Sequence, residues 1–147
     1  MLPEYKELFV KYLNNLKAEI SSYKNESDIW ELAGSISNTP GNLCLHLCGN
    51  LQHYFGALIG KSGYIRKRDA EFSRKNVSRD ELLNEISSTV KSVSDVFDKI
   101  DERELGQNFP DKTFGENATN GDAILHCAIH FGYHLGQINY HRRILKY

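Results

Sequence analysis

The chain has 147 residues, a formal net charge of −1 and a sequence pI of about 6.6. Its length suits one domain with a hydrophobic core of its own, so we expect a single domain over residues 1–147. The balanced charge gives no basic excess of the kind that binds nucleic acid. A mean hydropathy of −0.49 without a long apolar run argues against a membrane span.

The N-terminus and the cysteines both indicate a cytoplasmic protein. The first residues, Met-Leu-Pro-Glu-Tyr-Lys-Glu, lack the basic-then-apolar layout of a signal peptide. The three cysteines, Cys44, Cys48 and Cys127, are an odd number, which disfavours a disulfide framework. No second pair accompanies Cys44 and Cys48 to complete a zinc cluster. We therefore expect these side chains to be buried as small hydrophobic groups.

Two helices are predicted in the first part of the chain. Apolar residues recur at spacings of three and four from residue 2 to about residue 24, which is the helical period. After an irregular connection, Thr39 is a good N-cap and Pro40 suits the first helical position. The second helix should run from residue 40 to about residue 59 and stop at Gly60.

Two further helices follow a long polar segment. Residues 61–77 are predicted to form a surface loop, and loops longer than about 12–15 residues are often functional. Ser78 and Glu81 form a capping box that opens a third helix, which ends near residue 100. A fourth helix spans about 120–145. Its predicted core stripe consists of Ile124, Leu125, Ala128, Ile129, Phe131, Leu135, Ile138 and Ile144.

Four long helices without a convincing strand predict an all-α four-helix bundle. The connection between the second and third helices is long enough to cross the bundle rather than turn back. In such bundles, metal sites are built from inward side chains on facing helices. The long connection would then help to wall a pocket beside such a site.

Regularly spaced histidines are the main chemical signal. His126, His130 and His134 follow one another at every fourth residue, so they share one face of the predicted helix. His126 and His134 lie two turns apart, roughly 12 Å along the axis, and cannot easily share one ion. A third ligand must therefore come from another element. His46, which lies among apolar positions of the second helix, is the candidate.

Two interpretations of these histidines remain open from spacing alone. In the first, His46, His130 and His134 bind one divalent ion and leave a coordination position open, as in catalytic zinc sites. Zinc, nickel and iron all accept imidazole ligands. In the second, the histidines are satisfied core or surface residues. His126 is either a competing partner for His130 or a supporting group.

The sequence lacks the motifs of two known classes of metalloprotein. The sequence contains neither the HExxH motif of zincins nor the Glu-x-x-His motif of ferritin-like di-iron proteins. The carboxylates considered as general bases, Glu71, Glu116 and Asp122, lie in loops or at a helix start. A thiol whose pKa a metal lowers needs no such base, because the thiolate is itself the nucleophile. His53 and His141 are interpreted as structural.

At these residues the chain resembles the DinB/YfiT-like superfamily of four-helix-bundle proteins. The matching text is His-Leu-Cys-Gly-Asn-Leu from His46 and His-Phe-Gly-Tyr-His-Leu-Gly-Gln-Ile from His130. Similar family members place one histidine on the second helix and HxxxH followed by Gly-Gln on the fourth. The stretch from Arg66 to Phe72 also resembles a patch of one uncharacterised branch.

The resemblance implies a divalent metal, zinc or nickel, held by His46, His130 and His134, and a homodimer. Characterised relatives include transferases and isomerases that use mycothiol, bacillithiol or glutathione. We therefore expect a metal-dependent thiol S-transferase or a hydrolase, with a low-molecular-weight thiol and a small electrophile as partners. Neither nucleic acid nor a membrane is expected as a partner. The alternative is a non-enzymatic metal-binding stress or sensor protein, or a dimerisation module.

Overall fold

Side chains at the helix starts fix where three of the long helices begin. In the computed structural model, which describes residues 1–145, the hydroxyls of Thr39, Ser78 and Thr119 accept hydrogen bonds from backbone N–H groups in the first turns. The caps predicted at Thr39 and Ser78 are therefore confirmed. The predicted capping box at Ser78 is only half formed, because the carboxylate of Glu81 pairs instead with Arg74. Residues 146 and 147 of the expected domain lie outside the described residues.

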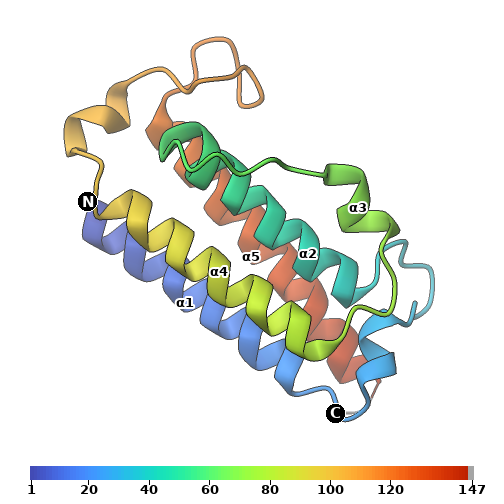
Figure 1. The fold of residues 1–147 in the computed structure, drawn as a ribbon. Helices are drawn as coiled ribbons and strands as arrows, with labels where there is room; N and C mark the ends of the chain where they lie inside the picture. The colour runs from blue at the N-terminus through green and yellow to red at the C-terminus, as the bar shows by residue number, and fades with distance from the viewer. Residues whose placement is uncertain (146–147) are drawn as a thin grey trace.

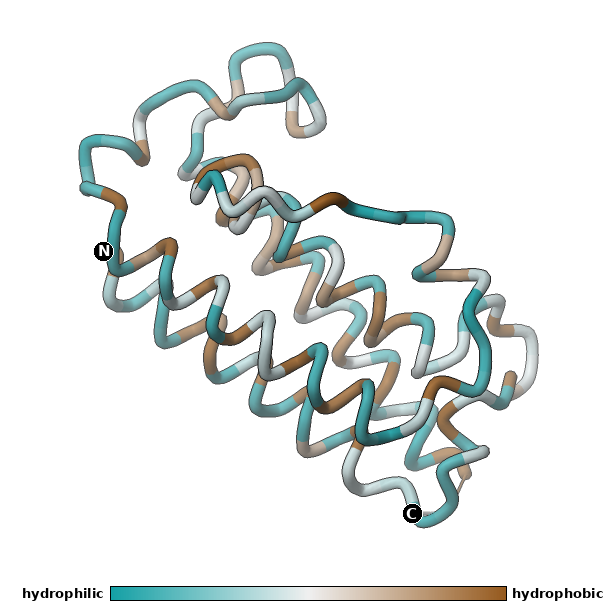
Figure 2. The backbone as a smooth tube through the Cα atoms, viewed as in Figure 1, coloured by the Kyte–Doolittle hydropathy of each residue, from teal (hydrophilic) through white to brown (hydrophobic). Residues whose placement is uncertain are grey.

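The chain is an all-α bundle, as predicted (Figure 1). Its long elements are α1 (Leu2–Ser21), α2 (Pro40–Leu51), α4 (Arg79–Phe97) and α5 (Asn120–Ile144). Shorter elements are the π-helix η2 (Gln52–Ile59), which continues α2, the helix α3 (Arg68–Ser73), and the 3-10 turns η1 (Glu26–Trp30) and η3 (Glu102–Gly106). Apolar positions recur along the long helices, whereas the connections are mostly hydrophilic (Figure 2). Within residues 1–145, no helix combines the length and apolar character needed to cross a membrane.

The connection between α2 and α4 runs back along the length of the bundle. As a result α1 and α5 point one way, and α2 and α4 point the other way (Figure 1). The predicted crossing is thus confirmed, but the prediction of an entirely irregular loop over 61–77 is wrong. That segment contains α3, which packs against α2. Because other elements cover α2 on all sides, every residue from Pro40 to Leu51 is buried.

Helix α5 is apolar on more faces than the bundle covers. Its core side consists of Ala123, Ile124, Cys127, Phe131 and Ile138. Leu125, Ile129 and Ile144 were predicted to lie in the core but are 58 %, 66 % and 63 % exposed. The prediction is wrong there because apolar spacing alone does not say which of two apolar faces meets the other helices. We call the exposed set the α5 stripe: Leu125, Ile129, Tyr133, Tyr140 and Ile144.

Candidate metal centre

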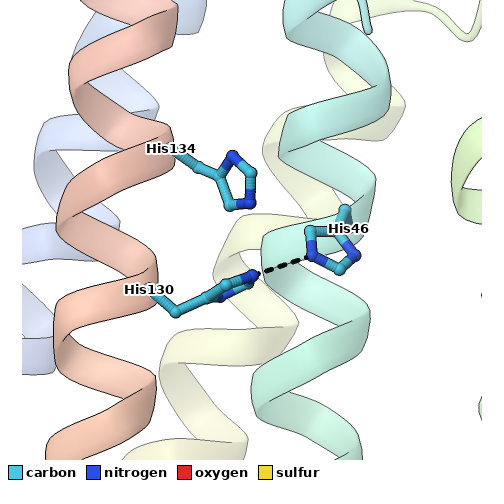
Figure 3. Close-up of side chains that lie close together, drawn as sticks. All are labelled: His46, His130 and His134. Carbon is cyan, nitrogen blue, oxygen red and sulfur yellow. Dashed lines mark hydrogen bonds between the residues drawn. The ribbon is translucent and has the colours of Figure 1, made fainter.

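Helices α2 and α5 bring three imidazoles together (Figure 3). His46 of α2 faces His130 and His134, which lie on consecutive turns of α5. One ring nitrogen from each residue lies within 4.8 Å of the other two. Within residues 1–145, this is the one group of histidine, cysteine or acidic side chains close enough to share a metal ion. The structure therefore brings together the three residues that the sequence analysis selected.

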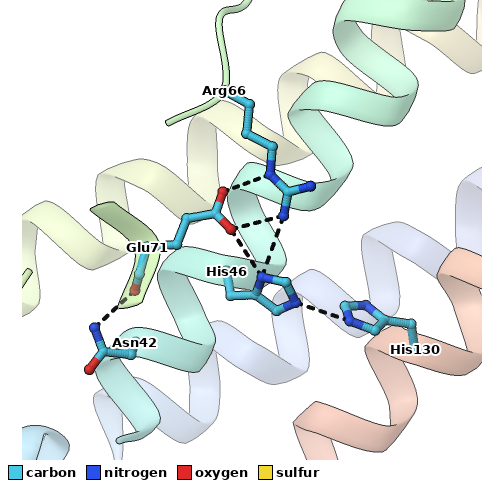
Figure 4. Close-up of polar contacts among 5 residues, drawn as sticks. All are labelled: Asn42, His46, Arg66, Glu71 and His130. Carbon is cyan, nitrogen blue, oxygen red and sulfur yellow. Dashed lines mark hydrogen bonds and ion pairs between the residues drawn. The ribbon is translucent and has the colours of Figure 1, made fainter. Parts of the chain in front are cut away.

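A buried carboxylate orients the ring of His46. Nδ1 of His46 lies 3.0 Å from Oε1 of Glu71, and both side chains are more than nine-tenths buried. An ionised carboxylate only accepts hydrogen bonds, so Nδ1 carries the hydrogen and donates it. In the neutral form of the ring, the lone pair then sits on Nε2, which points toward His130 (Figure 4).

His134 is oriented in a similar way by a neighbour on its own helix. Its Nδ1 lies 2.7 Å from the amide oxygen of Gln137, three residues further along α5. That oxygen accepts, so Nδ1 donates and the lone pair of the neutral ring sits on Nε2. Burial lowers the pKa of His134, which favours this neutral form. A neutral imidazole is the form that binds a metal.

The two ring nitrogens of His130 are not both satisfied by hydrogen bonds. Its Nε2 lies 3.0 Å from Nε2 of His46, while its Nδ1 is buried without a hydrogen-bond partner among the described residues. If Nε2 carries the hydrogen, an acceptor is buried unpaired at Nδ1. If Nδ1 carries it, an unpaired donor is buried and two lone pairs face each other. Such an unpaired buried group costs about 1–3 kcal/mol.

Protonation does not resolve this conflict near neutral pH. Burial, together with the positive charge that His134 and His46 would carry, lowers the pKa of His130 to about 4. The ring is therefore neutral at pH 7. A divalent cation among the Nε2 atoms would turn the facing lone pairs into ligands. The donor set and the burial of the site thus fit a divalent metal ion.

A second charged group holds Glu71 in place. Arg66 donates from Nε to Oε2 and from Nη2 to Oε1, both at 2.8 Å (Figure 4). Burial alone would raise the pKa of Glu71, but hydrogen bonds from His46 and Arg66 outweigh it and leave the pKa below its ordinary value. Glu71 is therefore an anion at neutral pH. The arrangement is a carboxylate–histidine pair of the kind that supports metal ligands.

Two residues of α2 make room for Glu71 and hold its helix. A Cβ added at Gly49 would lie 2.1 Å from Oε2 of Glu71, so only glycine leaves that carboxylate in place. Asn42 donates from Nδ2 to the backbone carbonyls of Glu71 and Arg74, each at 2.9 Å. From the sequence, Glu71 was a possible base without a defined position, and no pattern pointed to a role for Gly49 in the site.

A cavity of about 260 Å³ opens beside His46 and His130. Its walls come from α2 and η2, from α5, and from the two long connections. Lining side chains include Asn50, Tyr54, Arg66, Arg68, Phe114 and His126. The long connection therefore helps to wall the cavity, as predicted. Nearly all of Asn50 is buried, and its Oδ1 has no hydrogen-bond partner in the part of the chain that the structure describes.

The other histidines lie apart from the three that converge. His126 packs on the ring of Phe114, with 5.3 Å between centroids, and faces the cavity rather than the metal ligands. His141 is structural: its Nδ1 accepts from the hydroxyl of Tyr23 at 2.8 Å, and its Nε2 donates to the carbonyl of Glu31 at 2.9 Å. These bonds tie the end of α5 to the chain on both sides of η1, at Tyr23 before it and Glu31 after it.

The remaining candidate carboxylates serve other purposes. Glu116 forms an ion pair with Lys112. Asp122 accepts hydrogen bonds from the backbone N–H and the hydroxyl of Thr119, each at 2.8 Å, at the start of α5. Among the lining residues that the structure describes, the cavity has no carboxylate. A general base of the Asp or Glu type is therefore absent from that lining.

The buried thiols are poor nucleophiles. The three cysteines are free and buried, as predicted. Cys127 lines the cavity, but burial raises the pKa of its thiol to about 12. A hydrogen bond with Cys48, together with burial, raises the pKa of Cys44. Neither Cys44 nor Cys127 is a thiolate at neutral pH, and Cys48 is buried and does not line the cavity, so a thiol nucleophile would have to come from a bound small molecule.

Comparison with known proteins identifies the family of the chain. A family model described as "Protein of unknown function (DUF1572)" matches residues 2–147, which is nearly the whole chain. Among curated proteins, none matches this sequence.

Proposed function

We propose that this chain, a member of the DUF1572 family of unknown function, binds one divalent metal ion through His46, His130 and His134. We further propose that the family is DinB-like and that the ion is zinc or nickel, with iron as an alternative. The observation that carries the proposal is the facing pair of Nε2 atoms at 3.0 Å on His46 and His130. With the hydrogen of His130 on Nδ1, two Nε2 lone pairs face each other, and a cation between them would turn this repulsion into coordination.

The reaction class that the site supports best is transfer of a low-molecular-weight thiol to a small electrophile. When bound, a divalent ion lowers the pKa of a coordinated thiol or water, which makes it a nucleophile at neutral pH. The three histidines hold the ion, and Glu71 keeps the ring of His46 in the ligating tautomer. The cavity admits the substrates. Because its described lining offers neither a carboxylate base nor a thiolate, an external thiol is the nucleophile that these residues favour.

A hydrolase is the second candidate, and His126 is the observation in its favour. This side chain is exposed and lines the cavity that adjoins His46 and His130. From there its imidazole could accept a proton from an attacking water, as general-base histidines do. Thiol-independent turnover that is lost in His126→Ala would support this candidate over thiol transfer.

Metal content is the decisive test of the proposal. Untagged protein should carry about one zinc, nickel or iron ion per chain by elemental analysis, as a three-histidine site predicts. His46→Ala and His134→Ala should lose that metal. His53→Ala, which removes a histidine outside the cluster, is the matched control and should keep it. If the wild-type protein carries no metal and binds none on titration, the histidines are structural and the non-enzymatic alternative leads.

A further inference from the structure

The cavity beside His46 and His130 has an unbalanced positive charge. Arg68, in the first turn of α3, lines the cavity, and its guanidinium lies 5.4 Å from the centroid of the Phe72 ring. No carboxylate pairs with it in the part of the chain that the structure describes. Arg66, in contrast, is neutralised by its two bonds to Glu71. Of the two guanidiniums in the cavity wall, only that of Arg68 is left for a ligand.

The ring of Phe72 contacts both Arg68 and His46, one of the proposed metal ligands. The guanidinium of Arg68 lies over the ring of Phe72, and that ring packs on His46 with 4.9 Å between centroids. Arg68, His46 and His130 line the same cavity, so one small ligand in it can contact all three. The cavity volume of about 260 Å³ admits a molecule of that size.

The other walls add polar groups but no competing anion. No acidic side chain is among the described residues that line the cavity. Glu71 lies behind His46 and is already paired with Arg66. Asn50, which is more than nine-tenths buried, lines the same cavity, and its Oδ1 lacks a donor among the described residues. Such a wall suits a polar ligand rather than an apolar one.

We propose that this cavity binds a small carboxylate, with the carboxylate on Arg68 and the reactive end at the three histidines. The inference rests on the proposed metal centre and names the substrate class of that centre. One unpaired guanidinium balances one negative charge, which suits a carboxylate better than a phosphate dianion. Guanidinium and carboxylate also match in geometry, because both are planar and form two parallel hydrogen bonds.

The test uses cobalt(II)-loaded protein and two thiols that differ only in charge. Binding of 4-mercaptobutyrate and of 4-mercaptobutanamide is followed by the thiolate-to-cobalt absorption band. The wild-type protein should bind the acid about fivefold more tightly than the amide, the upper range for solvent-accessible ion pairs. In Arg68→Gln this ratio should fall close to one, and Arg68→Lys should retain part of it.

Lys67→Gln is the matched control. It removes the same charge from the adjacent residue, but Lys67 does not line this cavity; it lines a different one, together with Tyr64 and Ala70. It should keep the wild-type ratio. Unchanged thermal melts of the metal-free variants would show that each is folded.

Four outcomes would overturn the inference. Equal affinities in the wild-type protein would mean that the cavity does not select an anion. A preference that survives Arg68→Gln would mean that the acid chelates cobalt directly. Equal losses in Arg68→Gln and Lys67→Gln would reveal only an effect of net charge. Failure to take up cobalt would instead refute the proposed metal centre, and this inference with it.

Discussion

Replacing Glu71 by glutamine separates the two tasks of the buried carboxylate. The amide oxygen of glutamine still accepts from His46, but its NH₂ group then faces the guanidinium of Arg66, which has only donors. The guanidinium is left without its counter-ion in a place where the Arg66 side chain is 9 % exposed. Removing one partner of such a buried pair costs about 3–5 kcal/mol. We therefore expect the free energy of unfolding of metal-free Glu71→Gln to be about 3 kcal/mol lower than that of the wild type.

The same substitution should weaken metal binding. A neutral amide supports the imidazole less well than a carboxylate, and loss of such support costs about 10–100-fold in metal affinity. Urea unfolding of chelator-treated protein measures stability, and competition with a chromophoric chelator measures zinc affinity. The control is Glu81→Gln, which breaks an exposed pair with Arg74. Exposed pairs contribute about 0–1 kcal/mol, and this pair lies outside the metal site.

A double variant distinguishes the two effects. Arg66→Met combined with Glu71→Gln removes the unpaired cation, so stability should recover while zinc affinity stays low. Two results would refute the reasoning. If Glu71→Gln is as stable as Glu81→Gln, the ion pair is not a buried one. If zinc affinity is unchanged, Glu71 does not orient His46.

Three further predictions follow from the same structure. Gly49→Ala should displace Glu71 and so lower both the free energy of unfolding and the zinc affinity. Gly132→Ala is the control, because its Cβ would make only ordinary contacts, and it should change neither quantity. Urea unfolding and chelator titrations measure the two quantities. Metal-free protein should lose stability as pH falls from about 6.5 toward 4, because His130 has a pKa of about 6.5 in the unfolded chain and about 4 in the folded one. Urea unfolding midpoints across this range should fall for the wild type and fall less for His130→Asn. Ile129→Asp in the α5 stripe should turn the expected homodimer into a monomer by sedimentation velocity, whereas Lys11→Glu on α1 should not; a monomeric wild type would contradict the expected assembly.

The long helices and the ligand trio were predictable because local patterns specify them. Thr39 and Pro40 mark the start of α2, and the spacing of His130 and His134 fixes their common face once the segment is helical. His46 could be chosen because a histidine among apolar positions needs a partner. These inferences use residues within a few turns of one another.

The contact between Glu71 and His46 was not predictable, because it depends on the path of the connection between α2 and α4 along the bundle. Glu71 lies 25 residues beyond His46, and only the path of the connection along the bundle brings them to 3.0 Å. No periodicity encodes that path. The covered face of α5 was missed for a related reason: it depends on which neighbours pack there, and the sequence of α5 is apolar on both sides.

The chain order of the three histidines has a consequence for when their cluster forms. His46 precedes His130 by 84 residues, and α5 follows α1 to α4 in the chain. While α1 to α4 emerge from the ribosome, the nascent chain can present only one of the three imidazoles. A single imidazole binds a divalent ion weakly compared with three held together. The proposed metal centre can therefore form only after α5 has been synthesised and has docked against α2.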